Sequence, residues 1–101
     1  MIEAADSCRA DVWLWRARFF KTRSLAARAI EQGGVRVTRG GLGSGVDKPS
    51  RQVKPGDVIA FPLGPKWVAA RVEALGWRRG PASEARALYT LLQPASRSAR
   101  P

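Results

Sequence analysis

The sequence predicts a small α+β domain with two short N-terminal helices packed on a small, mostly antiparallel sheet and a helix near the C-terminus. Helical spacing of apolar residues occurs twice near the N-terminus, period-two alternation follows, and helical spacing returns near the end. The 101 residues can form one modest core. This length excludes a catalytic domain joined to a separate cofactor domain.

The first expected helix covers residues 12–19, with Asp11 as its N-cap. Its inward stripe consists of Trp13, Leu14 and Ala17. Trp15 and Phe19 fall outside this stripe, and we expect Trp15 to be partly buried. The chain should turn at Phe20.

The second expected helix covers residues 25–32, with either Thr22 or Ser24 as its cap. Its apolar face consists of Ala26, Ala29 and Ile30, and Gly33 ends it in a left-handed conformation. Free amides at the start of this helix, with Lys21 and Arg23 beside them, predict a phosphate-binding position.

The middle of the chain predicts the sheet. Residues 35–37 form a short strand, and the glycine-rich residues 39–45 form a flexible hairpin connection. Residues 54–57 have the proline and glycine of a type II turn, and they lead into a strand at 58–61. Residues 67–75 alternate as a half-buried strand with Trp67 on the outer face.

A last helix opens at Pro81 and continues to Leu92, with apolar residues spaced to dock on the domain. We therefore divide the chain into a flexible N-terminus (1–8), the main domain (9–76), a docked C-terminal helix (77–93) and a disordered tail (94–101).

Positive charge is concentrated in the first half of the chain. The whole sequence has 18 Lys and Arg residues against 8 acidic ones, a net charge of +10. Residues 9–54 hold eleven of the basic residues and three acidic ones, a net charge of +8. A focused excess of this kind favours a polyanion such as nucleic acid. A membrane surface is disfavoured because no helix is both long and basic.

Several kinds of active site lack a necessary part. The chain has no His and one Cys, which excludes His-based catalysis, His metal ligands and a thiolate metal cluster. The acidic residues stand singly at expected caps and turns, so we expect no enzyme activity, no metal and no cofactor. Cys8 is expected to be an inert thiol, and the short, polar N-terminus predicts a cytoplasmic protein.

Two adjacent segments carry a family resemblance, Arg9–Trp15 (RADVWLW) and Arg18–Ala26 (RFFKTRSLA). They closely resemble the S4 RNA-binding domain, whose alpha-L fold has two helices on a small sheet. Further matches occur at Lys48–Ser50, Lys54–Asp57, Arg78–Ala85 and Leu88–Tyr89. Together these motifs resemble the fifteen-kilodalton heat-shock protein family of bacteria over residues 9–92.

The resemblance implies a protein that binds ribosomal RNA of the large (50S) subunit. In that family, stalled large subunits that still carry a nascent chain on a transfer RNA are recognised and recycled under heat stress. The implied partners are ribosomal RNA and the large subunit, with transfer RNA as a candidate, and we expect a monomer. The residues expected to contact RNA are Arg9, Arg18, Lys21, Thr22, Arg23, Ser24, Arg28, Arg36, Lys48 and Arg51.

Recognition should rest on phosphates and on the shape of folded RNA, because we expect few exposed aromatic residues that could stack on bases. Two alternatives stay open. A DNA-binding helix-turn-helix protein would use the second helix, which offers only Arg28 and Gln32 beyond its apolar face. A general module for structured RNA would have a non-ribosomal target.

The sequence departs from the family at three places. Ala10 replaces a larger Leu, residues 37–39 read Val-Thr-Arg and are followed by extra glycines, and the basic extension after the last helix is nearly absent. Weaker binding, or a larger role for the hairpin, would follow from the missing extension.

Overall fold

The computed structural model describes residues 6–92, and it confirms the α+β fold class. Its elements, in chain order, are β1 (Cys8–Arg9), α1 (Ala10–Arg16), α2 (Arg23–Glu31), β2 (Val35–Arg39), β3 (Leu42–Val46), β4 (Gln52–Val53), β5 (Val58–Leu63), β6 (Lys66–Val72), α3 (Ala82–Ala85), the 3-10 turn η1 (Arg86–Leu88) and β7 (Tyr89–Leu91).

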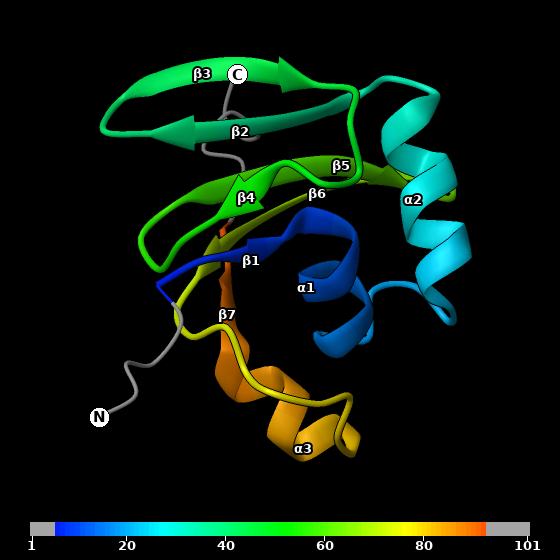
Figure 1. Cartoon of the computed structure of the whole chain (residues 1–101), viewed down its shortest axis with the longest axis vertical. Coiled ribbons are helices and arrows are strands. Elements are labelled where there is room, and N and C mark those ends of the chain that lie inside the picture. Colours follow the sequence, from blue (N-terminus) through cyan, green and yellow to red (C-terminus); the bar gives the residue numbers. More distant parts are fainter. Residues whose placement is uncertain (1–5, 93–101) are drawn as a thin grey trace, which may run out of the picture.

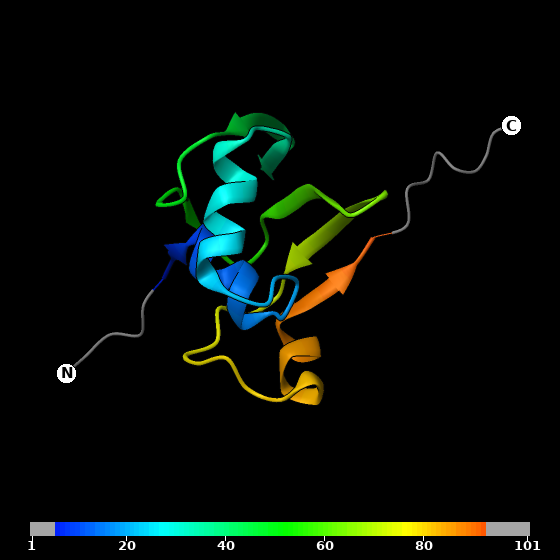
Figure 2. The same cartoon turned by 90° about the vertical axis from the view of Figure 1, so that its right-hand side faces the viewer.

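The main sheet contains five antiparallel strands in the order β3-β2-β5-β6-β7, and β1 pairs with β4 in a separate ribbon. Helices α1 and α2 lie on one side of the strands β5, β6 and β7, and α3 lies next to the start of β7 (Figures 1 and 2). The core therefore forms between this pair of helices and the main sheet.

Trp13 is the largest fully buried side chain of this core. It packs with Leu14, Ile30 and Phe61, each of which would contribute about 1.5–3 kcal/mol by leaving water. The indole N–H of Trp13 donates to the carbonyl of Ala74 at 2.9 Å, so its polar atom is satisfied inside the core. The predicted inward stripe of the first helix is confirmed.

The start of α1 differs from the prediction. The helix begins at Ala10, and its N-cap is Arg9, which makes no side-chain cap. Asp11 is not the N-cap, because it lies inside the first turn and is buried. Phe19 also differs from expectation, since it packs against Phe61 and Tyr89 at centroid distances of 5.1 and 4.6 Å.

The end of α1 is a Schellman-type turn, in which the amide of Phe19 donates to Leu14 and the amide of Arg18 donates to Trp15. Arg18 adopts φ = 67°, the left-handed conformation in which glycine is usual. Its side chain compensates, because Nε donates to the carbonyl of Gly80 at 2.8 Å.

The prediction for the second helix is confirmed in its main features. Thr22 is the N-cap and its hydroxyl accepts from the amide of Leu25 at 3.1 Å, which selects Thr22 over Ser24. Ala26 and Ile30 are buried, and Gly33 has φ = 85° just beyond the helix. The helix begins two residues earlier than expected, at Arg23.

The glycine-rich segment is more regular than predicted. Residues 42–46 form strand β3, paired with β2 in register from Val35↔Val46 to Arg39↔Leu42. The prediction of a flexible connection over residues 39–45 is therefore wrong. Only Gly40 and Gly41, both at positive φ, are needed for the turn between β2 and β3. The turn at residues 54–57 is confirmed by Gly56 at φ = 97° and by the bond from the Asp57 amide to the Lys54 carbonyl at 3.0 Å.

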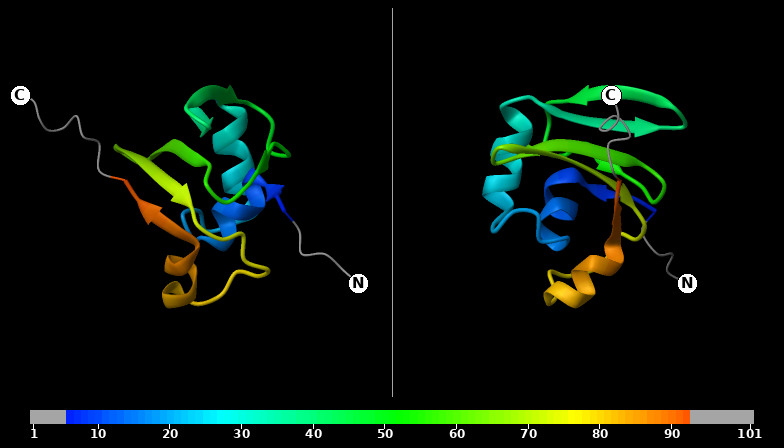
Figure 3. Two further views of the ribbon diagram at one scale, coloured as in Figure 1. Left: turned by 90° about the vertical axis from the view of Figure 1, so that its left-hand side faces the viewer. Right: turned by 180° about the vertical axis from the view of Figure 1, so that it is seen from behind.

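The predicted C-terminal helix is also wrong in its extent. Helix α3 and η1 end at Leu88, and residues 89–91 form strand β7 (Figure 3). Tyr89 pairs with Val72 and Leu91 with Ala70, so hydrogen bonding to β6 outweighs the helical spacing of the sequence. Ala85 and Leu88 are buried, as docking requires.

The predicted domain boundaries stay predictions. The expected flexible N-terminus overlaps the described chain only at residues 6–8, where Cys8 already pairs with Val53. The expected tail, residues 94–101, lies outside the described residues. Within residues 6–92, no helix has the length and apolar character needed to cross a membrane.

Candidate nucleic-acid interface

Asp11 is the centre of a cluster of charged residues at the start of α1. Its side chain is only 4% exposed, and its two oxygens accept hydrogen bonds from Nε and Nη2 of Arg9, both at 3.0 Å. Nη2 of Arg23, at the start of α2, lies 3.7 Å from the same carboxylate. The two half-exposed guanidinium groups are thus held near the same carboxylate, one from the N-cap of α1 and one from the first residue of α2.

The loop before β4 is fixed to the same end of α1. The amide of Ala10 donates to the carbonyl of Arg51 at 2.8 Å, and the amide of Asp11 donates to Pro49 at 3.2 Å. The loop forms an open cavity of about 220 Å³ whose side-chain lining includes Lys48, Ser50 and Arg51. The residues predicted at the edge of the RNA surface therefore lie beside the two helix starts.

The N-terminus of α2 completes this surface. Lys21, Thr22, Arg23 and Ser24 are all exposed. The first amides of a helix lack partners within the helix and carry partial positive charge, which favours an anion. A shallow depression lined by Asp11, Arg23, Ser24 and Ala27 lies at this point.

We use the term α1–α2 basic surface for Arg9, Lys21, Thr22, Arg23, Ser24, Lys48 and Arg51. The hydrogen bonds from Arg9 to Asp11 and the negative charge of that carboxylate raise the pKa of the Arg9 guanidinium above its ordinary value. Arg9 therefore stays charged at every physiological pH. Arginine in this fixed, forked arrangement is suited to bidentate contact with phosphate.

Three predicted contact residues lie elsewhere. Arg18 is held by Gly80 at the opposite end of α1. Arg28 is exposed on α2, beyond its first turn. Arg36 lies on β2 between the buried Val35 and Val37, and its guanidinium lies near Gly43 of β3, on the sheet face that points away from the core. The structure does not bring Arg36 together with the helix starts.

Sequence reasoning missed two features. Exposed aromatic residues are not scarce, because Trp77 is 77% and Trp67 52% exposed. The alternation of residues 67–75 placed Trp67 outward, but no pattern in the sequence marked Trp77. The second missed feature is an ion pair between the buried Asp57 and the half-exposed Arg39, which are 18 residues apart.

Cys8 is a partly buried free thiol. Burial raises the pKa of the Cys8 thiol, which fits the expectation of an unreactive side chain. Within residues 6–92, no three Cys, Asp or Glu side chains are grouped so that they could hold a metal ion.

Comparison with known proteins defines the class first. The S4 domain model matches residues 8–37, which include β1, α1, α2 and most of the α1–α2 basic surface. With the two helices packed on a small antiparallel sheet, this makes the chain an S4-domain protein.

Relatives define the family. Heat shock protein 15 of Escherichia coli K12 is 42% identical over 85 residues, which are 84% of this chain and 60% of that protein. The RQC P-site tRNA stabilizing factor of Listeria innocua is 33% identical over 90 residues, covering 88% of this chain and 90% of that protein. The structure of Vibrio cholerae heat shock protein 15, described as trimeric, matches with a TM-score of 0.73 at 37% identity, covering 85% of this chain and 82% of that one.

The chain belongs to the heat shock protein 15 family. It spans 60% of the length of the curated Escherichia coli relative.

Proposed function

We propose that this protein binds ribosomal RNA of the large subunit through the α1–α2 basic surface and acts in the rescue of stalled large subunits. The observation that carries the proposal is that two helix starts and one loop gather arginines and lysines on one surface, and that both helix starts lie in the part of the chain that matches the S4 domain. Sequence-independent phosphate contacts of this kind supply most of the affinity for nucleic acid.

The names of the relatives support the ribosomal part. One group is named for heat shock and the other for stabilising a P-site transfer RNA in RQC. We therefore infer that transfer RNA on the large subunit is a second partner, and that the protein acts by binding, without catalysis, in the cytoplasm. The expectation of a monomer stays a prediction.

The test uses charge reversal at lysines that hold no structural ion pair. Lys21 and Lys48 make no side-chain hydrogen bond or ion pair within residues 6–92, unlike Arg9 and Arg23, so a Lys21→Glu/Lys48→Glu variant should fold. The matched control is Lys54→Glu/Lys66→Glu, with the same change of charge outside this surface. Each protein is sedimented with purified large subunits on a sucrose gradient.

The parent and the control should sediment with large subunits, and the Lys21→Glu/Lys48→Glu variant should stay at the top. On purified ribosomal RNA, six to eight phosphate contacts give a log–log salt slope of about −4 to −7, and the loss of two contacts reduces it by about 1.5. If the variant and the control lose binding to large subunits equally, binding depends on the total charge of the protein and the proposed surface is wrong. Equally tight binding of duplex DNA would favour the helix-turn-helix alternative.

A further inference from the structure

The segment that joins β6 to α3, residues 73–81, carries an exposed aromatic ring on a fixed backbone. Trp77 is 77% exposed, more than any other aromatic residue in the described chain. The segment is nevertheless held closely, because Nη1 of Arg16 donates to the carbonyls of Leu75 and Gly76 at 3.3 and 2.9 Å. An exposed apolar ring on a rigid support is typical of a binding surface.

Two more arginines fix the same segment to α1 and the turn that follows it. Nε of Arg79 donates to the carbonyl of Trp15 at 3.1 Å, and Nε of Arg18 donates to Gly80 at 2.8 Å. Gly76, at φ = 71°, lies so close to Leu88 that an added Cβ would approach that side chain to 3.2 Å. The position of Trp77 is therefore set by contacts on both sides of it in the chain.

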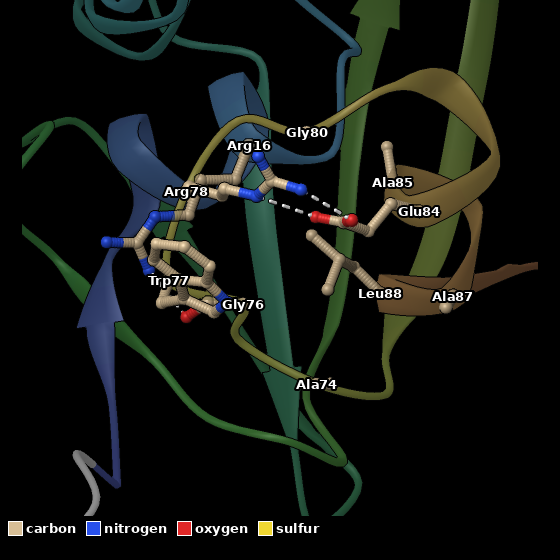
Figure 4. Close-up of a pocket in the computed structure, with 10 residues that line it drawn as sticks. All are labelled: Arg16, Ala74, Gly76, Trp77, Arg78, Gly80, Glu84, Ala85, Ala87 and Leu88. Carbon is tan, nitrogen blue, oxygen red and sulfur yellow. Dashed lines mark hydrogen bonds and ion pairs between the residues drawn. The ribbon is translucent and has the colours of Figure 1, made fainter.

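A cavity of about 210 Å³ opens beside the ring (Figure 4). Its apolar lining comes from Trp77, Ala85, Ala87 and Leu88, among others. The guanidinium of Arg78 lies 5.1 Å from the ring centroid of Trp77 and forms two hydrogen bonds, at 3.0 and 2.8 Å, with Glu84. The Trp77 ring thus lines an apolar cavity, and the Arg78 guanidinium lies over the ring.

The charges around the cavity favour a polyanion. Arg16 and Arg78 line the cavity with Glu84, which pairs with Arg78, and Arg79 follows next in the chain. Nε of Arg16 is buried and has no hydrogen-bond partner among residues 6–92. Arg78 lies over one face of the Trp77 ring, so a base would stack on the opposite face, and nearby guanidinium groups can donate hydrogen bonds to the phosphate that follows the base. Unpaired nucleotides of RNA offer both groups at once.

We propose that Trp77 and the adjoining cavity form a stacking site for an unpaired nucleotide of RNA. This inference rests on the proposed RNA-binding function and extends it from phosphate contacts to a base contact at the opposite end of α1. The bond between Arg18 and Gly80 connects the site to the turn that leads into α2.

The test compares single-stranded with duplex RNA. A Trp77→Ala variant is measured against a ten-nucleotide oligoadenylate and against a fully paired RNA duplex of similar charge, with Trp67→Ala as the matched exposed-tryptophan control and Trp77→Phe as the conservative variant. Loss of one stacked base weakens binding by about 5- to 150-fold. We expect that loss for oligoadenylate only, an unchanged salt slope, and partial recovery with Trp77→Phe.

Equal affinity of parent and Trp77→Ala for oligoadenylate would overturn the inference, as would an equal loss on duplex RNA. If Trp77→Ala no longer binds large subunits but binds every RNA as the parent does, the inference is also overturned, and the surface around Trp77 would contact a protein. The Lys21→Glu/Lys48→Glu variant is measured on the same RNAs, because its unchanged salt slope would overturn the phosphate surface separately. Thermal unfolding of Trp77→Ala should match the parent, since the ring is exposed.

Discussion

Two buried aspartates with arginine partners show how similar pairs serve different purposes. Asp11 and Asp57 are the two buried acidic residues of the described chain, and each accepts a two-pronged contact from one arginine. Asp57 also accepts the amide of Lys54 at 2.9 Å, whereas Asp11 attracts a second guanidinium, that of Arg23, at 3.7 Å.

The difference lies in what each carboxylate organises. Asp57 joins the end of β2 to the turn before β5, and its carboxylate oxygens accept hydrogen bonds from Arg39 and from the Lys54 amide. Asp11 holds two half-exposed guanidinium groups at the starts of α1 and α2, with their outer atoms available. A buried carboxylate next to arginine is thus enclosed by the fold in one place and lies beneath the proposed RNA-binding surface in the other.

The largest expected effect comes from Asp57→Asn. This substitution removes the charge from a buried carboxylate and leaves the half-exposed Arg39 without its counter-ion, so the free energy of unfolding should fall by about 1.5–3 kcal/mol. Urea unfolding followed by tryptophan fluorescence measures it. The salt slope of RNA binding should not change; a reduced slope would mean that this pair also belongs to the interface.

The contribution of the Asp57–Arg39 ion pair to the free energy of unfolding should depend on pH in the acid range. Burial raises the pKa of Asp57, but the hydrogen bonds from Arg39 and Lys54 and the charges of Arg39 and Arg51 outweigh it, so the pKa lies below its usual 3.8. A depressed carboxyl pKa contributes stability that is complete above the unfolded-state value and is lost as pH falls through the folded-state value.

The measurement is urea unfolding of parent and Asp57→Asn from neutral to strongly acidic pH. The stability difference between them should shrink as pH falls below 3.8, because the parent loses the contribution that the variant already lacks. Using the difference also removes the contribution of Glu73, whose pKa is lowered by Thr90 and Arg71. A constant difference across this range would contradict the structural reading of Asp57.

A smaller effect on stability is expected for Asp11→Asn, about 1–2 kcal/mol from the lost ion pairs and the lost helix-dipole interaction. RNA affinity should rise at low salt, because the α1–α2 basic surface gains one net positive charge. If Arg23 then reaches one more phosphate, the salt slope steepens by about 0.7 to 0.9. A fall in affinity, with the fold intact, would show that Asp11 is needed to orient the arginines.

The parts of the fold that depend on residues close together in the sequence could be predicted. The inward stripe of α1, the Thr22 cap, the apolar face of α2 and the turn at residues 54–57 follow from spacing and from residue preferences. Seven of the ten residues expected to contact RNA lie around the two helix starts, whereas Arg18, Arg28 and Arg36 lie elsewhere. The contact of all ten with RNA stays a prediction.

The errors occur where long-range contacts decide. Residues 89–91 have helical spacing but pair with β6, and Asp11 has a cap-forming side chain but is buried beside Arg9 and Arg23. Arg18 looked like a free cation, yet its carbonyl partner is 62 residues away. No local pattern can reveal which arginines the fold itself occupies.

The hydrogen bonds between α1 and residues 74–80 also set an order for folding. Trp13, Arg16 and Arg18 find their partners at Ala74, Leu75, Gly76 and Gly80, across separations of 59 to 62 residues. Contacts this distant in sequence form late, because the loop must close before they contribute. During synthesis, the first helix of the chain can therefore reach its final packing only after residue 80 has been made, so the surface that begins the sequence is among the last parts to be completed.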